Sequence, residues 1–262
     1  MNNKLKFLLG LCLLIIFVSG CGPKPDEVAL QLAEAVNAQN LEGALALFAV
    51  DAVVTSVSPE PFNGKAEIQG WLEGMFADDF KMEAEIGEVS GNQVIEHDTM
   101  TMDSMSFFGV EPLTGTSELT VEDGKIQAIN FSFSEETLAD LQTAPFVARE
   151  DLIGIWSVGT FMQFNDDGTS RVANKVGDLA EPVSETHPGG LEAWTYDGMV
   201  MTMQTLEPGV GEGYTCTPDE LGIYLVRWAG DDLDRLKFEA VADQCCARFG
   251  GMMWGLWKPV TP

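Results

Sequence analysis

The stretch FNGKAEIQGWLEGMF, residues 62–76, has the clearest secondary-structure pattern in the chain. After the turn pair Asn63-Gly64, apolar residues recur at intervals of three and four: Ile68, Trp71, Leu72, Met75 and Phe76. This spacing places them on one face of a helix. Because such a face is buried only against another layer, the sequence on either side should supply a sheet or further helices.

The flanking sequence supplies both. Upstream, Asp26 is the expected N-cap of a helix that ends near Asn40, a second short helix follows at 44–48, and 51–57 has the composition of a strand. Downstream, strands are expected at 81–89, 93–103, 116–122 and 125–133, the last two joined by the hairpin turn Glu122-Asp123-Gly124-Lys125. The pattern predicts an α+β domain over residues 26–142, a cone of three helices on a curved antiparallel sheet.

The expected strand at 93–103 alternates in a way that suggests a site. Val94, Glu96, Asp98, Met100 and Met102 share one face, and the methionines mark it as the interior. Carboxyl groups in an apolar pocket have raised pKa values and can shuttle protons, so Glu96 and Asp98 are the candidate catalytic residues. The alternative is a bulge that turns both carboxylates to solvent. His97 falls on the opposite face, away from the pocket.

Four apolar side chains of this domain are candidates for lining a ligand pocket: Trp71, Phe76, Met100 and Phe131. The alternative for each is simple core packing, which is the more common role of such residues.

Three segments of the domain resemble the SnoaL-like branch of the nuclear transport factor 2-like superfamily: LFAVDAVV (47–54), FNGKAEIQGWL (62–72) and VEDGKIQAINF (121–131). The resemblance covers about residues 24–142. It implies a pocket-bearing fold whose members include isomerases, cyclases and dehydratases as well as pure binding and assembly domains. No Tyr precedes Tyr196, so the phenolic oxyanion donor of the isomerase-like members is missing here, which weighs against an enzyme.

Residues 143–150 read as a hinge, and 151–262 as a separate all-β domain. Turn signals such as Asp166-Asp167-Gly168 and Asp197-Gly198 separate short apolar runs. Strands are expected at 154–165, 168–176, 190–196, 199–206, 211–217, 220–228, 233–243 and 252–258. About eight such strands predict a barrel or a strongly curved sheet.

Gly154-Ile155-Trp156 resembles the start of the first strand of lipocalin-like barrels. That resemblance implies an Arg over the Trp, for which Arg248 is the candidate. In a barrel, Trp156, Trp194 and Trp228 are candidate ligand-binding residues; the alternative is that they fill the core.

The N-terminus carries an export signal. Lys4 and Lys6 precede an apolar run at 7–18, too short to span a bilayer comfortably, and Val18-Ser19-Gly20-Cys21 resembles the lipobox of bacterial lipoproteins. The resemblance implies a signal peptide over 1–20, acylation of Cys21 (palmitate among the chains), and a tether at 21–25. We therefore expect a bacterial cell-envelope protein held on the membrane by lipidated Cys21. The alternatives are an ordinary signal peptide or a short membrane anchor.

Three further thiols remain: Cys216, Cys245 and Cys246. Adjacent cysteines rarely bond to each other, so Cys216 should form a disulfide with one of the pair, preferably Cys245, leaving a buried, quiet third thiol. The two histidines, His97 and His187, are far apart, so no metal site is expected. No phosphate-binding or dinucleotide fingerprint appears, and no cofactor is expected.

The balance of charge and composition narrows the function. With 41 acidic and 14 basic residues, the net charge of −27 argues against a nucleic-acid partner. The leading hypothesis is a lipid-anchored, non-enzymatic protein that binds a small apolar ligand or an envelope protein. One alternative is a SnoaL-like enzyme that transfers protons on a small hydrophobic substrate. The other is an assembly module that forms a homodimer through the sheet of its N-terminal domain.

Overall fold

The computed structural model describes residues 22–58, 60–211, 216–253 and 255–260. The signal peptide, Cys21 and part of the expected strand at 211–217 lie outside the described residues. The chain forms two compact units. Unit 1 contains the described residues up to Asp103 together with Val110–Leu141, and unit 2 contains Ser104–Gly109 and the chain from Gln142 onward. Among the described helices, none is both long enough and apolar enough to cross a membrane.

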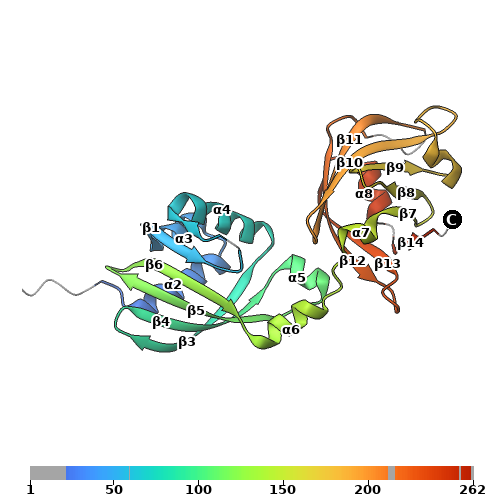
Figure 1. The fold of residues 1–262 in the computed structure, drawn as a ribbon. Coiled ribbons are helices and arrows are strands. Elements are labelled where there is room, and N and C mark those ends of the chain that lie inside the picture. Colours follow the sequence, from blue (N-terminus) through green and yellow to red (C-terminus); the bar gives the residue numbers. More distant parts are fainter. Residues whose placement is uncertain (1–21, 59, 212–215, 254, 261–262) are drawn as a thin grey trace, which may run out of the picture. The chain divides into compact units, whose positions relative to one another are not determined.

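Unit 1 is a six-stranded sheet with helices packed against it (Figure 1). The strand order is β2-β1-β6-β5-β4-β3, in which β1 and β6 are parallel and every other pair is antiparallel. The strands are β1 (Phe48–Thr55), β2 (Phe62–Asn63), β3 (Lys81–Ser90), β4 (Gln93–Thr101), β5 (Leu113–Glu122) and β6 (Lys125–Phe133). The β5–β6 hairpin closes through Asp123 and Gly124, both with positive φ, as the sequence predicted.

The helices of unit 1 are amphipathic, and their apolar residues are buried. They are α2 (Pro25–Asn37), α3 (Leu41–Leu47) and α4 (Gly64–Ala77). Helix α2 packs on β3, β4 and β5, and α4 packs on β1. Asp26 does not cap α2. The helix begins one residue earlier, at Pro25, which suits the first helical position, and the Glu27 carboxylate accepts a hydrogen bond from the N–H of Lys24.

Short elements connect the two sheets: α5 (Asp103–Phe108), α6 (Glu135–Thr143) and α7 (Arg149–Leu152). The expected hinge is packed within unit 2. The Trp228 N–H donates to the Pro145 carbonyl at 2.8 Å, the Tyr196 hydroxyl donates to the Val147 carbonyl at 3.1 Å, and Val147 is buried.

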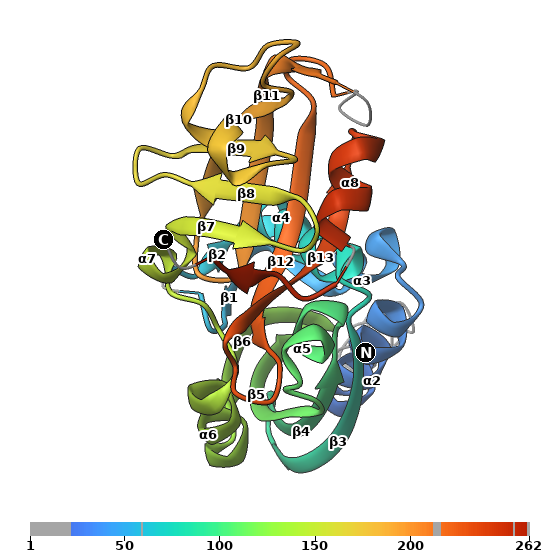
Figure 2. The ribbon, with the colours of Figure 1, turned by 90° about the vertical axis from the view of Figure 1, so that its right-hand side faces the viewer.

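Unit 2 is an eight-stranded antiparallel sheet that curls into a nearly closed barrel (Figure 2). The order is β13-β12-β11-β10-β9-β8-β7-β14. The two edges meet where Leu236 of β13 exchanges backbone hydrogen bonds with Trp257, at 2.8 and 2.9 Å. The elements are β7 (Gly154–Ser157), β8 (Phe161–Phe164), β9 (Thr169–Ala173), a 3-10 helix (Val176–Ala180), β10 (Gly189–Tyr196), β11 (Val200–Val210), β12 (Leu221–Ala229), β13 (Arg235–Asp243), α8 (Cys246–Met253) and β14 (Lys258–Pro259).

Two strands of unit 2 were predicted wrongly. The expected strand at 154–165 is a hairpin, because Gly159 has a φ of 115° and turns the chain between β7 and β8. The expected strand at 252–258 begins inside helix α8, which packs against β13. A short apolar run of this kind does not by itself distinguish a buried helix from a strand.

Candidate active site

Strand β4 presents two carboxyl groups to the interior of unit 1. Its burial alternates residue by residue, with Val94, Glu96, Asp98 and Met100 buried. Glu96 and Asp98 are each only 2% exposed. No bulge interrupts the pairing of β4 with β5, so both side chains stay on the interior face.

Each carboxyl group keeps an oxygen that the fold leaves free. The Ser117 hydroxyl, from the adjacent strand β5, donates a hydrogen bond to Asp98 Oδ2 at 2.5 Å. Among the described residues, Glu96 Oε1 and Asp98 Oδ1 have no hydrogen-bond partner. A buried acceptor without a partner is costly, so these two oxygens are the natural contact points for a bound molecule.

Burial shifts the acidity of both groups. It raises the pKa of Glu96 to about 7, and the nearby charge of Asp98 adds to the shift. Burial also raises the pKa of Asp98, against which the hydrogen bond from Ser117 and the charge of His97 both act. The two groups are coupled, and the last proton of the pair is held by Glu96 near neutral pH.

The carboxyl groups open into an otherwise apolar cavity of about 180 Å³. Of the predicted lining residues, Trp71, Met100 and Phe131 contribute to its wall. Phe76 does not: it lies in the last turn of α4, one residue beyond Met75, which lines the cavity, and Phe80 after the helix lines it too. One residue further along a helix rotates a side chain by about 100°, enough to take Phe76 off the wall.

A groove of about 760 Å³ adjoins the cavity and gives it an approach from the surface. The two share Trp71, Met75, Phe80 and Met102. The apolar side chains at this junction would have to move aside for a molecule to pass from the groove to the carboxyl groups.

Gly115 shapes the floor of the cavity. It pairs with Asp98 across the sheet, and a Cβ atom at Gly115 would lie 2.4 Å from the Phe131 ring. The missing side chain therefore lets Phe131 lie flat against β5, beside Asp98. Neither Gly115 nor Ser117 was singled out from the sequence, since their roles depend on which strands are neighbours.

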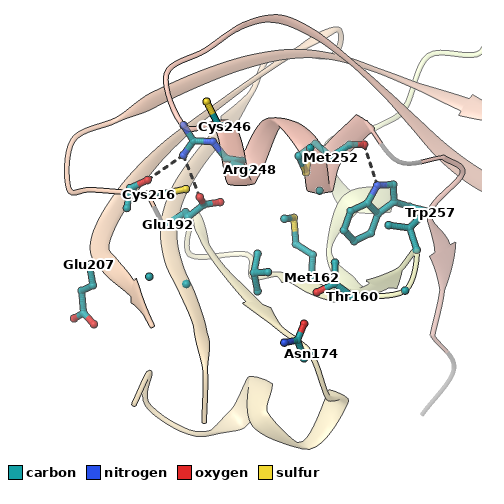
Figure 3. A pocket seen from close by; sticks show the side chains of 18 residues that line it. Thr160, Met162, Asn174, Glu192, Glu207, Cys216, Cys246, Arg248, Met252 and Trp257 are labelled. Atoms are coloured by element: carbon teal, nitrogen blue, oxygen red, sulfur yellow. Dashed lines mark hydrogen bonds and ion pairs between the residues drawn. The ribbon is translucent and has the colours of Figure 1, made fainter. Parts of the chain in front are cut away.

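In unit 2, the predicted ligand-binding tryptophans pack into the core. Trp156 and Trp194 are buried and donate their indole N–H to the carbonyls of Leu152 and Thr169, at 2.8 and 2.9 Å. Trp228 packs on Trp156, with ring centroids 6.1 Å apart. None of the three lines the largest cavity of unit 2 identified in the described residues, which has a volume of about 510 Å³ (Figure 3).

Arg248 binds carboxylates and does not cover Trp156. From helix α8 it donates to Asp243 at 2.8 and 3.1 Å and to Glu192 at 3.0 Å. The cation that does lie over an indole ring is Arg149, 4.9 Å from the centroid of Trp194. Two acidic residues within reach outweigh a ring face for a buried guanidinium group, because the charged hydrogen bonds are stronger.

The expected disulfide between Cys216 and Cys245 is present, with Cα atoms 5.2 Å apart. The third thiol, Cys246, is exposed and not buried as expected, because it begins α8 on the solvent side. The sulfur atoms of Cys216 and Cys245 also lie near the Glu220 carboxylate, in a metal-like group. As a disulfide, however, they offer no thiolate ligands.

Residues 29–129 match the family model of the SnoaL-like domain, so unit 1 contains a domain of this kind. No curated protein matches the chain. Three solved structures are similar to it, each over less than half its length. An NTF2-like protein of unknown function from Cytophaga hutchinsonii is 15% identical, with 47% of this chain and 99% of that chain covered and a TM-score of 0.37.

The epoxide hydrolase/cyclase-like enzyme SalBIII, which has a role in pyran ring formation in polyether salinomycin, is 13% identical. The match covers 43% of this chain and 92% of that one, with a TM-score of 0.38. A computationally designed 17-OHP binder is 18% identical, with 42% and 90% covered and a TM-score of 0.36.

Proposed function

We propose that unit 1 is an acid–base catalyst that moves a proton on a small apolar carbonyl compound. The observation that carries the proposal is the pair of buried carboxyl groups on β4, each with an oxygen that no described residue binds, in an apolar cavity. The sequence favoured a non-enzymatic binding protein. A dry apolar cavity would suit that role, whereas two titratable groups in the cavity favour catalysis.

The two groups suit different roles. Asp98, whose charge is supported by Ser117 and His97, is the base that takes a proton from the carbon next to the carbonyl group. Glu96, with a pKa of about 7, still carries its proton near neutral pH and donates a hydrogen bond to the developing oxyanion. This neutral acid would replace the phenolic donor that the domain lacks. Return of the proton from Asp98 to another carbon completes an isomerisation, so no cofactor is needed.

The cavity limits the substrate to a small molecule. Its volume of about 180 Å³ is below the roughly 300 Å³ at the lower end of drug-sized sites. A single ring with one carbonyl group is the expected size, and larger substrates would extend into the adjoining groove past Trp71.

The test is the conversion of 3-cyclohexen-1-one into 2-cyclohexen-1-one, followed by ultraviolet absorbance. We expect the full chain to accelerate it, and Asp98→Asn to lose about 10²–10⁴-fold of that rate. Glu118→Gln, an exposed carboxyl on β5, is the matched control and should retain the rate. Saturable binding of the ketone without turnover above the buffer rate would contradict catalysis and favour a binding protein.

We also propose that the chain is exported and anchored through lipidated Cys21. The support is the n-region with Lys4 and Lys6, the short apolar run and the lipobox-like Val18-Ser19-Gly20-Cys21. Labelling cells of a bacterial host with an alkyne analogue of palmitate should mark the wild-type chain and leave Cys21→Ser unmarked. An equally labelled Cys21→Ser chain would contradict the assignment.

A further inference from the structure

The 510 Å³ cavity of unit 2 has an apolar wall and one buried carboxyl group (Figure 3). Val158, Met162, Val172, Met252 and Trp257 supply most of the apolar lining. Glu192, on β10, lines the same cavity and is only 4% exposed. The volume is within the range of small-molecule sites, which pair an apolar wall with few polar groups.

The donors of Arg248 are all committed within the protein. Its Nε and Nη2 atoms donate to Asp243, and Nη2 also donates to the Glu220 carbonyl at 3.1 Å. Its Nη1 atom donates to Glu192 Oε1 at 3.0 Å and to the Thr205 hydroxyl at 3.1 Å. A guanidinium group has five N–H donors, and these five contacts use them. An anionic ligand would therefore find no free donor on this side chain.

Asp243 holds the larger share of the Arg248 charge. Besides Arg248, it accepts hydrogen bonds from the Tyr224 hydroxyl and from the N–H of Cys245, at 2.8 Å for the latter. Glu192 has only one contact to the guanidinium, and its Oε2 atom has no hydrogen-bond partner among the described residues. Two carboxylates facing one cation leave the pair with an excess of negative charge, and Glu207 adds another carboxylate to the lining.

Glycine residues leave room beside Glu192. A Cβ atom added at Gly190, Gly250 or Gly251 would meet no atom within 4 Å, and all three line the cavity. Gly190 precedes Glu192 by two residues on β10, so a side chain there would point to the same face. The space next to the carboxyl group is wide enough for a compact body and not only for a linear chain.

We propose that this cavity binds an organic ammonium ion with a compact apolar body, which donates a hydrogen bond to Glu192 Oε2. The apolar body packs against Met162, Met252 and Trp257, and the ammonium group supplies the donor and the positive charge that the cavity lacks. This site is separate from the carboxyl pair of unit 1, so neither proposal depends on the other.

The test is isothermal titration calorimetry on the full chain with three probes that share one apolar body: 1-aminoadamantane, 1-adamantanol and adamantane-1-carboxylate. We expect the ammonium ion to bind about tenfold more tightly than the alcohol, and the carboxylate to bind most weakly. Equal affinities, or a preference for the carboxylate, would overturn the proposal. Because this ranking is measured on the wild-type chain, it does not depend on any variant folding.

Methionine-methyl NMR locates the bound amine. Shifts at Met162 and Met252 are expected; shifts confined to Met100 and Met102 would place the amine in unit 1 and overturn the assignment. Glu192→Gln should lower the affinity for the amine about tenfold and remove the preference over the alcohol, whereas the matched control Glu207→Gln should leave both unchanged.

A second variant leaves Glu192 in place. Gly190→Val fills the space beside the carboxyl group, and its Cβ meets no neighbour, so the fold should tolerate it. We expect it to abolish binding of all three probes. Unchanged binding by a folded Gly190→Val chain would overturn the proposed position of the ligand.

Discussion

The two units each bury carboxyl groups beside a cavity, and they treat the charge in opposite ways. In unit 1, no described cation contacts Glu96 or Asp98, and burial raises both pKa values. In unit 2, Arg248 lies between Asp243 and Glu192 and opposes the rise that burial alone would give Glu192. The comparison indicates that an uncompensated pair is adjusted for proton transfer, whereas a compensated pair fixes a structure and leaves one oxygen for a ligand.

The largest expected effect is on the compensated side. Arg248→Met would leave two buried carboxylates without their cation, and we expect the free energy of unfolding of unit 2 to fall by about 3–5 kcal/mol. Urea denaturation followed by tryptophan fluorescence measures it, since most of the Trp residues are in unit 2. Arg149→Met is the control: its pair with Asp166 is exposed, so a loss below about 1 kcal/mol is expected. Equal losses in the two variants would contradict the comparison.

The pH dependence of catalysis tests the uncompensated side. If Asp98 is the base and Glu96 the acid, the rate should fall as pH rises through about 7, because Glu96 loses its proton. Glu96→Gln keeps an N–H donor and cannot ionise, so it should retain part of the rate and remove this limb of the profile. A rate that rises through pH 7 would instead make Glu96 the base.

Stability should follow the same ionisation. The raised pKa means that the folded chain holds its proton on Glu96 while the unfolded chain releases it, from pH 4.5 to about 7. The contribution of Glu96 to stability is therefore complete below pH 4.5 and is lost as pH rises to about 7, on the order of 3 kcal/mol. Thermal unfolding of the wild-type chain and of Glu96→Gln at several pH values measures it. The variant should show a flatter profile, and parallel profiles would contradict the raised pKa.

A smaller effect tests how the cavity is shaped. Gly115→Ala places a Cβ against the Phe131 ring, so we expect a loss of about 1–3 kcal/mol in stability and a higher KM for the ketone probe. Gly70→Ala, on α4 where a Cβ meets nothing within 4 Å, is the control and should be neutral or slightly stabilising. An unchanged KM in Gly115→Ala would mean that Phe131 does not help to hold the substrate.

Local patterns predicted what local physics determines. The alternation over 93–103 placed Glu96 and Asp98 inside before any strand pairing was known, because the side-chain period of a strand is fixed. The helical spacing after Gly64 predicted α4 for the same reason. Phe76 was misplaced because a wide apolar stripe does not say which of its edges meets the cavity.

Features that depend on distant partners could not be predicted. Arg248 finds Glu192, Thr205 and Asp243 on three different strands, and the sequence offers no sign that these meet. Ser117 reaches Asp98 only because β5 pairs with β4 in one particular register. The tryptophans of unit 2 were assigned to a cavity from their size, whereas the cavity lies where glycines and a helix leave space.

The closure of unit 2 has a consequence for how the chain is made. Strand β7 pairs with β14, and Leu236 bonds to Trp257, so the barrel joins segments about a hundred residues apart. Its edges cannot meet until Lys258 and Pro259 have left the ribosome. A chain with this order of synthesis stays open throughout translation, which is the state that a secretion channel for unfolded polypeptides accepts.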